Sequence, residues 1–343
     1  MKKLAYFDSS HDMPEEIIRA AGFTPYKILG DVRTSNDPAD QYLAKFFCPA
    51  ARSWLTEALA HSQEWAGIIF AHGCDATNRH YDIWKKHVET PFLHWFNSPI
   101  KNDAAARKFF IVELKRLIKS LEDTYSVNIS DGAIHEAIVL SNKIKKRLQT
   151  LSLLRSRKDV PNRDYFTVVA DCIANGPANI VEMLDTRAQE WDARPDFPAG
   201  KKRFLLTGSD VTYVEFMDIL DECDIRVVRD DLSLGERYYA TLISETGDPL
   251  EALADYYLTI PRPATRPTIQ ERVDYLLGAL KETAVDGVLS QNLKFCEPYA
   301  YDAVEVNKAI KDAGFRVLHL EREFTALPDQ QLVNRLMAFN EML

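Results

Sequence analysis

The sequence predicts two α/β domains with parallel sheets, joined by a helical segment. In the first hundred residues, strand-length apolar runs alternate with helical patterns, and the same alternation returns at Lys201. Between them, residues 103–154 carry apolar side chains at helical spacing and contain no proline. Because the rhythm strand, helix, strand is typical of parallel sheets, we expect a first α/β domain over residues 1–100. A helical connecting segment over 101–200 and a second α/β domain over 201–343 then complete the chain.

The first domain contains four apolar runs of strand length. A helix over residues 14–22 follows the first run, because proline and two acids begin it and Gly22 ends it. A second helix is predicted over residues 77–87. The predicted strands cover residues 4–7, 24–29, 67–71 and 92–96.

The helical segment and the second domain follow from the same reasoning. The stretches FFIVELKRLIKSLE and HEAIVLSNKIKKRLQTLSLL predict an antiparallel helical pair, with further helices to about residue 192. In the second domain the predicted strands cover residues 203–207, 225–228, 287–290 and 315–320. Its predicted helices cover residues 213–222, 250–258, 269–283, 303–313 and 330–343.

The two α/β halves contain a matching segment. WAGIIF leads to Gly73-Cys74-Asp75, a helix and PFLHWFN, whereas VDGVLS leads to Phe295-Cys296-Glu297, a helix and FRVLHLE. Each half therefore places a cysteine after a buried strand and before a helix, next to an acid. This match indicates a structural repeat, with each half flavodoxin-like or Rossmann-like.

Composition sets limits on function. The chain has 343 residues, of which 46% are hydrophobic and 27% charged, and its net charge of −9 argues against nucleic-acid binding. No apolar run approaches the roughly 18 residues that span a membrane, and MKKLAYFDSS lacks the apolar region of a signal peptide. We therefore expect a cytoplasmic protein. Thiols stay reduced there, so its five cysteines point to metal binding, catalysis or core packing rather than disulfides.

Three of the cysteines lie where ligands bind in such folds. Cys74 and Cys296 follow buried strands, and the carboxyl ends of parallel strands border the ligand crevice. Cys48 precedes a proline that suits the first turn of a helix. A helix N-terminus favours thiolate. Three widely spaced thiolates suit an iron–sulfur cluster with one open iron, although their spacing alone leaves structural zinc and simple burial open. Cys172 and Cys223 are interpreted as small apolar core residues.

Around these cysteines the chain resembles a known family. YFDSSHDMPEEIIRAAGFTPYKILG is similar to its proline–glutamate segment, and FFCPAARSWL and HGCDATNRHYDIW are similar to its first two cysteine segments. DGVLSQNLKFCEPYAYDAVEVNKAIKDAGFRVLHLE is similar to the third. The family is that of the cluster-bearing subunits of 2-hydroxyacyl-CoA dehydratases and benzoyl-CoA reductases.

The resemblance implies a cofactor and partners. Cys48, Cys74 and Cys296 would ligate one [4Fe–4S] cluster, and the chain would pair with a homologous subunit as a heterodimer. An ATP-hydrolysing iron–sulfur activator would supply single electrons. Ser233 and Arg262 stand where some relatives carry extra cysteines, so a double cluster is not expected. The chain also lacks the N-terminal helical extension common in the family.

The resemblance implies a reaction as well. An acyl-CoA thioester would be reduced by one electron to a ketyl radical, which in the dehydratases expels a β-positioned leaving group. An aryl-CoA reductase subunit and a non-catalytic electron-relay subunit are alternatives, as is a zinc-stabilised binding protein without redox chemistry.

Four further residues are weaker candidates for the site. His72 and Glu321 are candidate catalytic groups, since His72 precedes Cys74 by two residues and Glu321 ends a strand. Arg52 and Arg79 follow cluster cysteines and are candidates for the phosphates of coenzyme A. Ordinary surface or ion-pairing roles remain the alternative for all four.

Overall fold

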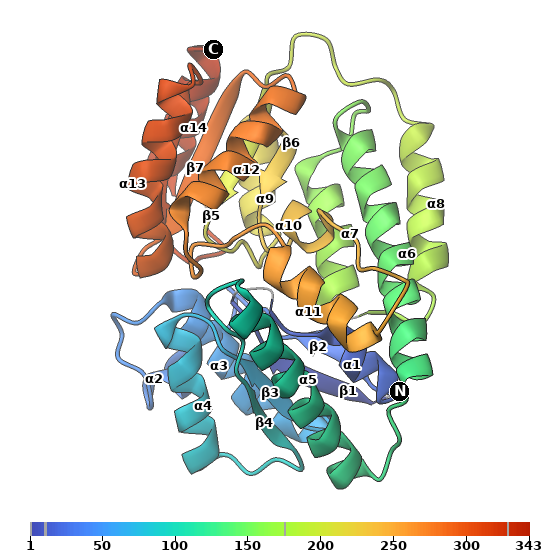
Figure 1. Ribbon diagram of the computed structural model, residues 1–343. Helices are drawn as coiled ribbons and strands as arrows, with labels where there is room; N and C mark the ends of the chain where they lie inside the picture. The colour runs from blue at the N-terminus through green and yellow to red at the C-terminus, as the bar shows by residue number, and fades with distance from the viewer. Residues whose placement is uncertain (1, 10–11, 175, 328) are drawn as a thin grey trace.

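The computed structural model describes residues 2–9, 12–174, 176–327 and 329–343. Within these ranges the chain forms two four-stranded sheets whose strands are all parallel, in the orders β2-β1-β3-β4 and β6-β5-β7-β8 (Figure 1). The two orders are identical when each half is counted from its own first strand. The predicted α/β class with two parallel sheets is therefore confirmed.

The first sheet has its most apolar strands at its centre. All four residues of β3 and the last four of β1 are buried, as expected for parallel strands covered on both faces. The strands are β1 Lys3–Phe7, β2 Thr24–Lys27, β3 Ile68–Ala71 and β4 Leu93–Phe96.

Helices from distant parts of the chain cover this sheet. Asp103 begins α5 (Ala104–Tyr125), because its carboxylate accepts the free N–H groups of Ala105 and Ala106. Helix α11 (Pro249–Thr259), from the second half of the chain, packs beside α5 in the same apolar cluster. The remaining elements of the first hundred residues are α1 Glu15–Ala20, α2 Asp37–Asp40, α3 Pro49–His61, η1 Ser62–Glu64 and α4 Asp75–His87.

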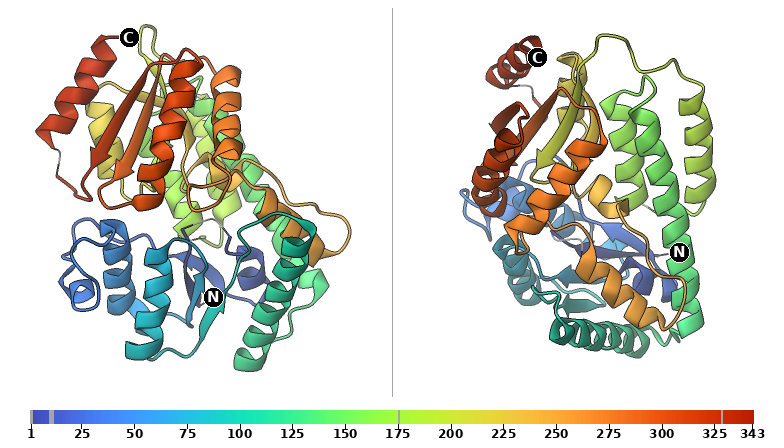
Figure 2. Two further views of the ribbon diagram at one scale, coloured as in Figure 1. Left: turned by 60° about the vertical axis from the view of Figure 1, so that its left-hand side comes forward. Right: turned by 45° about the horizontal axis from the view of Figure 1, so that its top comes forward.

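Helix α6 (Asp131–Arg155) links the two halves (Figure 2). Its first turns contribute Ile134 and Ile138 to the core under the first sheet, whereas Leu148 and Leu151 join the core of the second half. Its main partners are α8 (Ile180–Asp192) and α1. The predicted lengthwise pairing of α5 with α6 is therefore wrong, because their apolar faces pack on different layers.

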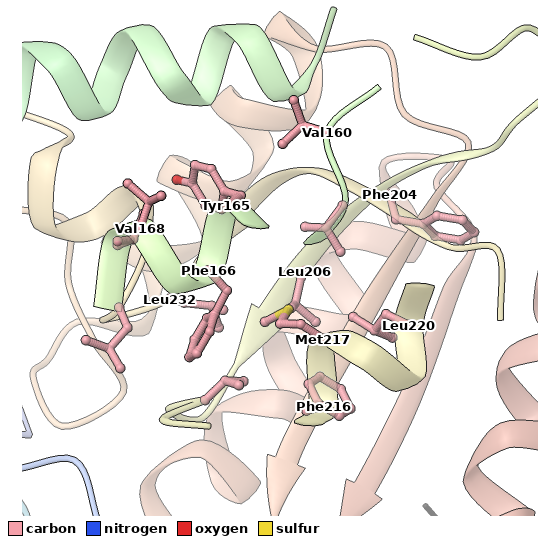
Figure 3. Packing of buried hydrophobic residues seen from close by; sticks show 14 of the residues in the cluster. Val160, Tyr165, Phe166, Val168, Phe204, Leu206, Phe216, Met217, Leu220 and Leu232 are labelled. Carbon is pink, nitrogen blue, oxygen red and sulfur yellow. The ribbon is translucent and has the colours of Figure 1, made fainter. Parts of the chain in front are cut away.

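The second half repeats the first. Phe204 and Leu206 of its sheet pack against Phe216 and Met217 of α9 and Phe166 of α7 (Figure 3). The elements are α7 Asn162–Ala174, β5 Arg203–Gly208, α9 Glu215–Glu222, β6 Arg226–Asp231, α10 Glu236–Tyr239, α12 Ile269–Glu282, β7 Gly287–Leu293, α13 Glu297–Asp312, β8 Val317–Arg322 and α14 Gln330–Glu341. No helix in the described ranges has both the length and the apolarity to cross a bilayer.

Two helix starts differ from the prediction in a way that affects the site. Helix α13 begins at Glu297 rather than at residue 303, since Pro298 fits the first turn of a helix. Helix α4 begins at Asp75 rather than at residue 77. Both helices therefore begin immediately after a cysteine.

Candidate functional site

Cys48, Cys74 and Cys296 occupy equivalent places in the structure. Each is the N-cap residue of a helix, of α3, α4 and α13 respectively. The last two follow β3 and β7, the strands beside the point where the order of each sheet reverses. Ligands of open parallel sheets bind at such switch points. The repeat thus brings two equivalent crevices together, with Cys48 beside them.

The three cysteines line one cavity of about 600 Å³ between the two halves of the chain. The cysteines themselves are partly exposed, whereas Cys172 and Cys223 are buried elsewhere, in the core of the second half. The other lining residues are Ser9, Phe46, Phe47, Ala50, Ala51, Trp54, Asp75, Ala76, Ser209, Asp210, Ala264, Thr265, Leu293, Phe295, Glu297, Pro298, Tyr299 and Tyr301.

Two serines in equivalent positions fix the loops that carry the cysteines. Ser9 follows β1, and its hydroxyl accepts a hydrogen bond from the backbone N–H of Cys74 at 3.1 Å. Ser209 follows β5, and its hydroxyl accepts from the N–H of Leu293 at 2.7 Å, three residues before Cys296. These bonds hold each cysteine loop to the strand beside it.

A third wall of the cavity comes from the loop before α12. Ala264 and Thr265 line the cavity. Arg266, buried next to them, forms an ion pair with Asp12 and donates to the carbonyl of Pro99 at 2.9 Å. The loop is therefore held to the first half of the chain.

Backbone N–H groups and a shared proton set the state of the thiols. The hydrogen bond between Cys48 and Cys296 lowers the pKa of the Cys48 thiol, and the N–H groups of Ala51 and Ala50 act in the same direction. The same bond, together with burial, raises the pKa of Cys296 well above its ordinary value. Burial raises the pKa of Cys74. Cys48 is therefore the thiolate of the pair, and Cys296 is the donor.

The spacing of the donors bears on which inorganic group they suit. Within the described ranges, no three His, Cys, Asp or Glu side chains are grouped closely enough for one metal ion. A [4Fe–4S] cluster has a different requirement, because each thiolate binds a different iron at the corner of a cube. Three thiols around one cavity, with N–H groups directed at their sulfurs, fit such a cluster better than they fit a single zinc ion.

Arg52 and Arg79 are engaged in ion pairs outside this cavity. Arg52 bonds to the carboxylate of Asp40, with its Nε 2.7 Å from an oxygen. Arg79 is exposed and pairs with Asp75 at 3.3 Å and with Asp82 at 2.8 Å. Neither guanidinium lines the cavity, and their role with coenzyme A stays a prediction.

His72 and Glu321 also lie outside the lining of the cavity. The His72 ring packs edge-on against Trp95, its Nδ1 is buried without a hydrogen-bond partner, and burial lowers its pKa. Glu321 is exposed at the end of β8, while Lys294 pairs with the nearby Glu323 at 2.8 Å. Their catalytic roles stay predictions.

The polar residues after the first strand of each half were not predicted as part of the site. Ser9 follows β1, and Ser209 and Asp210 follow β5, in corresponding places of the repeat. A polar residue directly after a buried strand was a usable signal, because that is where the sheet opens to its ligand.

Comparison with known proteins gives the family. The family model described as 2-hydroxyglutaryl-CoA dehydratase, D-component, matches residues 11–343. The chain therefore belongs to this family, and the family resemblance predicted from its sequence is confirmed.

Individual relatives match along most of their length. The (R)-phenyllactyl-CoA dehydratase beta subunit of Clostridium sporogenes is 25% identical over 335 residues, which cover 96% of this chain and 89% of the relative. The lactoyl-CoA dehydratase subunit beta of Anaerotignum propionicum is 23% identical over 96% of this chain and 89% of its own length. A subunit of the benzoyl-CoA reductase of Thauera aromatica is 24% identical, over 83% and 77% respectively. All three names are those of enzyme subunits, which agrees with the prediction that this chain is one.

Proposed function

We propose that this chain binds one [4Fe–4S] cluster through Cys48, Cys74 and Cys296 and acts as a subunit of a 2-hydroxyacyl-CoA dehydratase. The observation that carries the proposal is that the three cysteines, from both halves of the chain, begin helices around a single cavity. Family membership and relatives named as dehydratase subunits support it.

The protein contributes the environment of the cofactor. Helix N-termini place partial positive charge and free N–H groups beside the sulfurs, which stabilises thiolate. Apolar side chains, among them Trp54 and Leu293, keep water from the inner wall. When bound, the cluster would deliver single electrons to the carbonyl of an acyl-CoA thioester.

The partners follow from the same proposal. A homologous cluster-bearing subunit would complete a heterodimer, and an ATP-hydrolysing iron–sulfur activator would feed it electrons. A benzoyl-CoA reductase subunit is the second candidate function, favoured by the similarity to the Thauera aromatica protein. Assays of 2-hydroxyacyl-CoA and aryl-CoA panels with both partners, ATP and a low-potential donor separate the two functions.

The ligand set is tested by cysteine replacement. We expect the anaerobically reconstituted chain to bind about four irons and four sulfides per chain, and Cys48→Ser, Cys74→Ser and Cys296→Ser to lose the cluster absorbance. Cys223→Ser is the matched control, because this cysteine lies at the end of α9 and outside the cavity.

Two results would contradict the proposal. One is a wild-type chain without stoichiometric iron and sulfide after reconstitution. The other is full iron content in any of the three site variants while far-UV circular dichroism shows an intact fold.

A further inference from the structure

We propose that the cavity beside the three cysteines accepts an apolar or aromatic acyl group and rejects an acyl group that ends in a second carboxylate. This inference rests on the proposed function and names the substrate class of that same site. It follows from three features of the lining: exposed aromatic rings, one strained phenylalanine and the sign of its charges.

Aromatic side chains form most of the mouth. Phe46, Phe295 and Tyr301 line the cavity, yet 71%, 51% and 77% of their surfaces are exposed to water. Phe47, Trp54 and Tyr299 continue the aromatic lining towards the less exposed part of the cavity. Large rings exposed together around one opening mark a binding site for an apolar group, because covering them releases water from extensive apolar surface.

The backbone at Phe295 is unusual for such a residue. Its φ is +63°, in the left-handed region that bulky side chains rarely adopt. The conformation lies in the turn between β7 and α13, one residue before Cys296. Strain of this kind is concentrated at ligand sites, and here it accompanies a half-exposed ring at the mouth of the cavity.

The charged residues of the lining are all acids. They are Asp75, Asp210 and Glu297, and no lysine, arginine or histidine is among the described lining residues. Asp75 and Glu297 are exposed, whereas only 9% of Asp210 is accessible. A carboxylate on the ligand would therefore meet like charge without a basic partner, and its loss of water would not be compensated.

Asp210 is the acid that matters most for this selection. Its carboxylate accepts from the Ser233 hydroxyl, and the nearest guanidinium nitrogen of Arg237 is 3.9 Å away. Arg237 is shared, since its Nε lies 3.6 Å from Asp231 and it also donates to the Tyr299 hydroxyl. The Asp210 charge is thus only partly neutralised and acts in a site of low dielectric constant, where repulsion is strong.

The phosphates of coenzyme A fit this scheme only outside the mouth. They carry several negative charges, and the described lining offers them no basic side chain. The acyl group and the thioester would enter, while the nucleotide would remain beyond the exposed rings.

The test compares two thioesters that lack the reactive 2-hydroxyl group. Isothermal titration calorimetry under anaerobic conditions measures binding of 3-phenylpropanoyl-CoA and glutaryl-CoA to the full-length, iron-loaded chain. We expect the phenyl compound to bind at least about tenfold more tightly. Asp210→Asn should reduce that preference on the order of tenfold, mainly by improving glutaryl-CoA binding.

Two further variants localise the effect. Asp75→Asn removes an exposed carboxylate that is already paired with Arg79, so the preference should change less than about twofold. Tyr301→Ala removes an exposed ring and should weaken the phenyl compound by several-fold, a readout that holds even if Asp210→Asn does not fold.

The outcomes separate this inference from the proposed function. Equal affinity, or tighter binding of glutaryl-CoA by the wild-type chain, overturns the inference. Binding of neither thioester to a chain with full iron content also overturns it, and it leaves the chain as an electron-relaying cluster subunit. Absence of the cluster overturns both.

Discussion

Lys145 and Glu16 form a buried ion pair that ties α6 to α1, and its removal gives a sharp test of the fold. The Lys145 Nζ lies 3.6 Å from a Glu16 oxygen, and both side chains are almost completely inaccessible. Glu16 also accepts hydrogen bonds from Ser141 at 2.5 Å and from Tyr257 of α11 at 2.7 Å. The pair therefore joins three helices that are distant in sequence.

Replacing Lys145 by methionine keeps the volume and removes the charge. At 3.6 Å, two unit charges with an effective dielectric constant of about 20 attract by about 5 kcal/mol. Loss of one member of a buried pair typically costs about 3–5 kcal/mol, because the remaining charge stays buried. We expect Lys145→Met to lower the free energy of unfolding by about 3–4 kcal/mol at pH 7. At the entropy of unfolding typical for this chain length, that loss lowers Tm by about 5 °C.

The pH dependence fixes the sign of the effect. In the native protein the pKa of Glu16 is lowered: burial raises it, but Lys145 and the bonds from Ser141 and Tyr257 outweigh burial. A carboxyl with a lowered folded-state pKa stabilises the fold above its unfolded pKa, and this stabilisation is lost as pH falls through the folded pKa. Without Lys145, burial dominates and the Glu16 pKa rises, so part of the loss is recovered when Glu16 binds a proton near pH 5.

Urea unfolding followed by circular dichroism at pH 7 and pH 5 measures these differences. The double variant Lys145→Met/Glu16→Gln removes the unpaired charge and should recover more than half of the loss. The reasoning is refuted if Lys145→Met costs less than about 1 kcal/mol at pH 7. It is equally refuted if the double variant is no more stable than the single one.

The remaining predictions concern a glycine and a buried arginine, each with a control in the same chain. Gly208→Ala would place a Cβ 1.6 Å from the backbone oxygen of Gln291, at a φ of +131°, so unfolding midpoints should show a loss above about 4 kcal/mol. Gly278→Ala, inside α12 with open space around it, should instead gain about 0.5–1 kcal/mol; a neutral Gly208→Ala would contradict the β5–β7 pairing. Arg272→Met leaves Asp231 and Asp302 buried and should cost about 3–5 kcal/mol, whereas the same change at the exposed Arg79 should cost less than about 1 kcal/mol in thermal unfolding. Similar losses for the two arginine variants would argue against the buried network.

Local patterns in the sequence were sufficient for the secondary structure and for the repeat. The apolar runs of β1, β3, β5 and β7 are almost wholly buried, so they stand out without knowledge of their neighbours. The cysteines after β3 and β7 are recognisable for the same reason, since each stands directly between a buried strand and a helix.

The partners across the fold were decided by tertiary packing. Helix α11 leaves the second half and packs beside α5, because the apolar faces of both helices are completed only by each other and by the first sheet. Spacing along a helix gives the direction of its apolar face but not the surface that face will meet. The pairing of Lys145 with Glu16, across more than a hundred residues, has no local signal either.

The candidate site divides in the same way. The sequence by itself determined that Cys48, Cys74 and Cys296 would stand at helix starts, because proline, strand ends and helix patterns are short-range features. Only the tertiary structure placed Asp210 and the rings of Phe46 and Tyr301 around the same cavity. The physical reason is that the two halves, each with its own sheet, meet through long-range packing, and the surroundings of a site between them exist only after they have met.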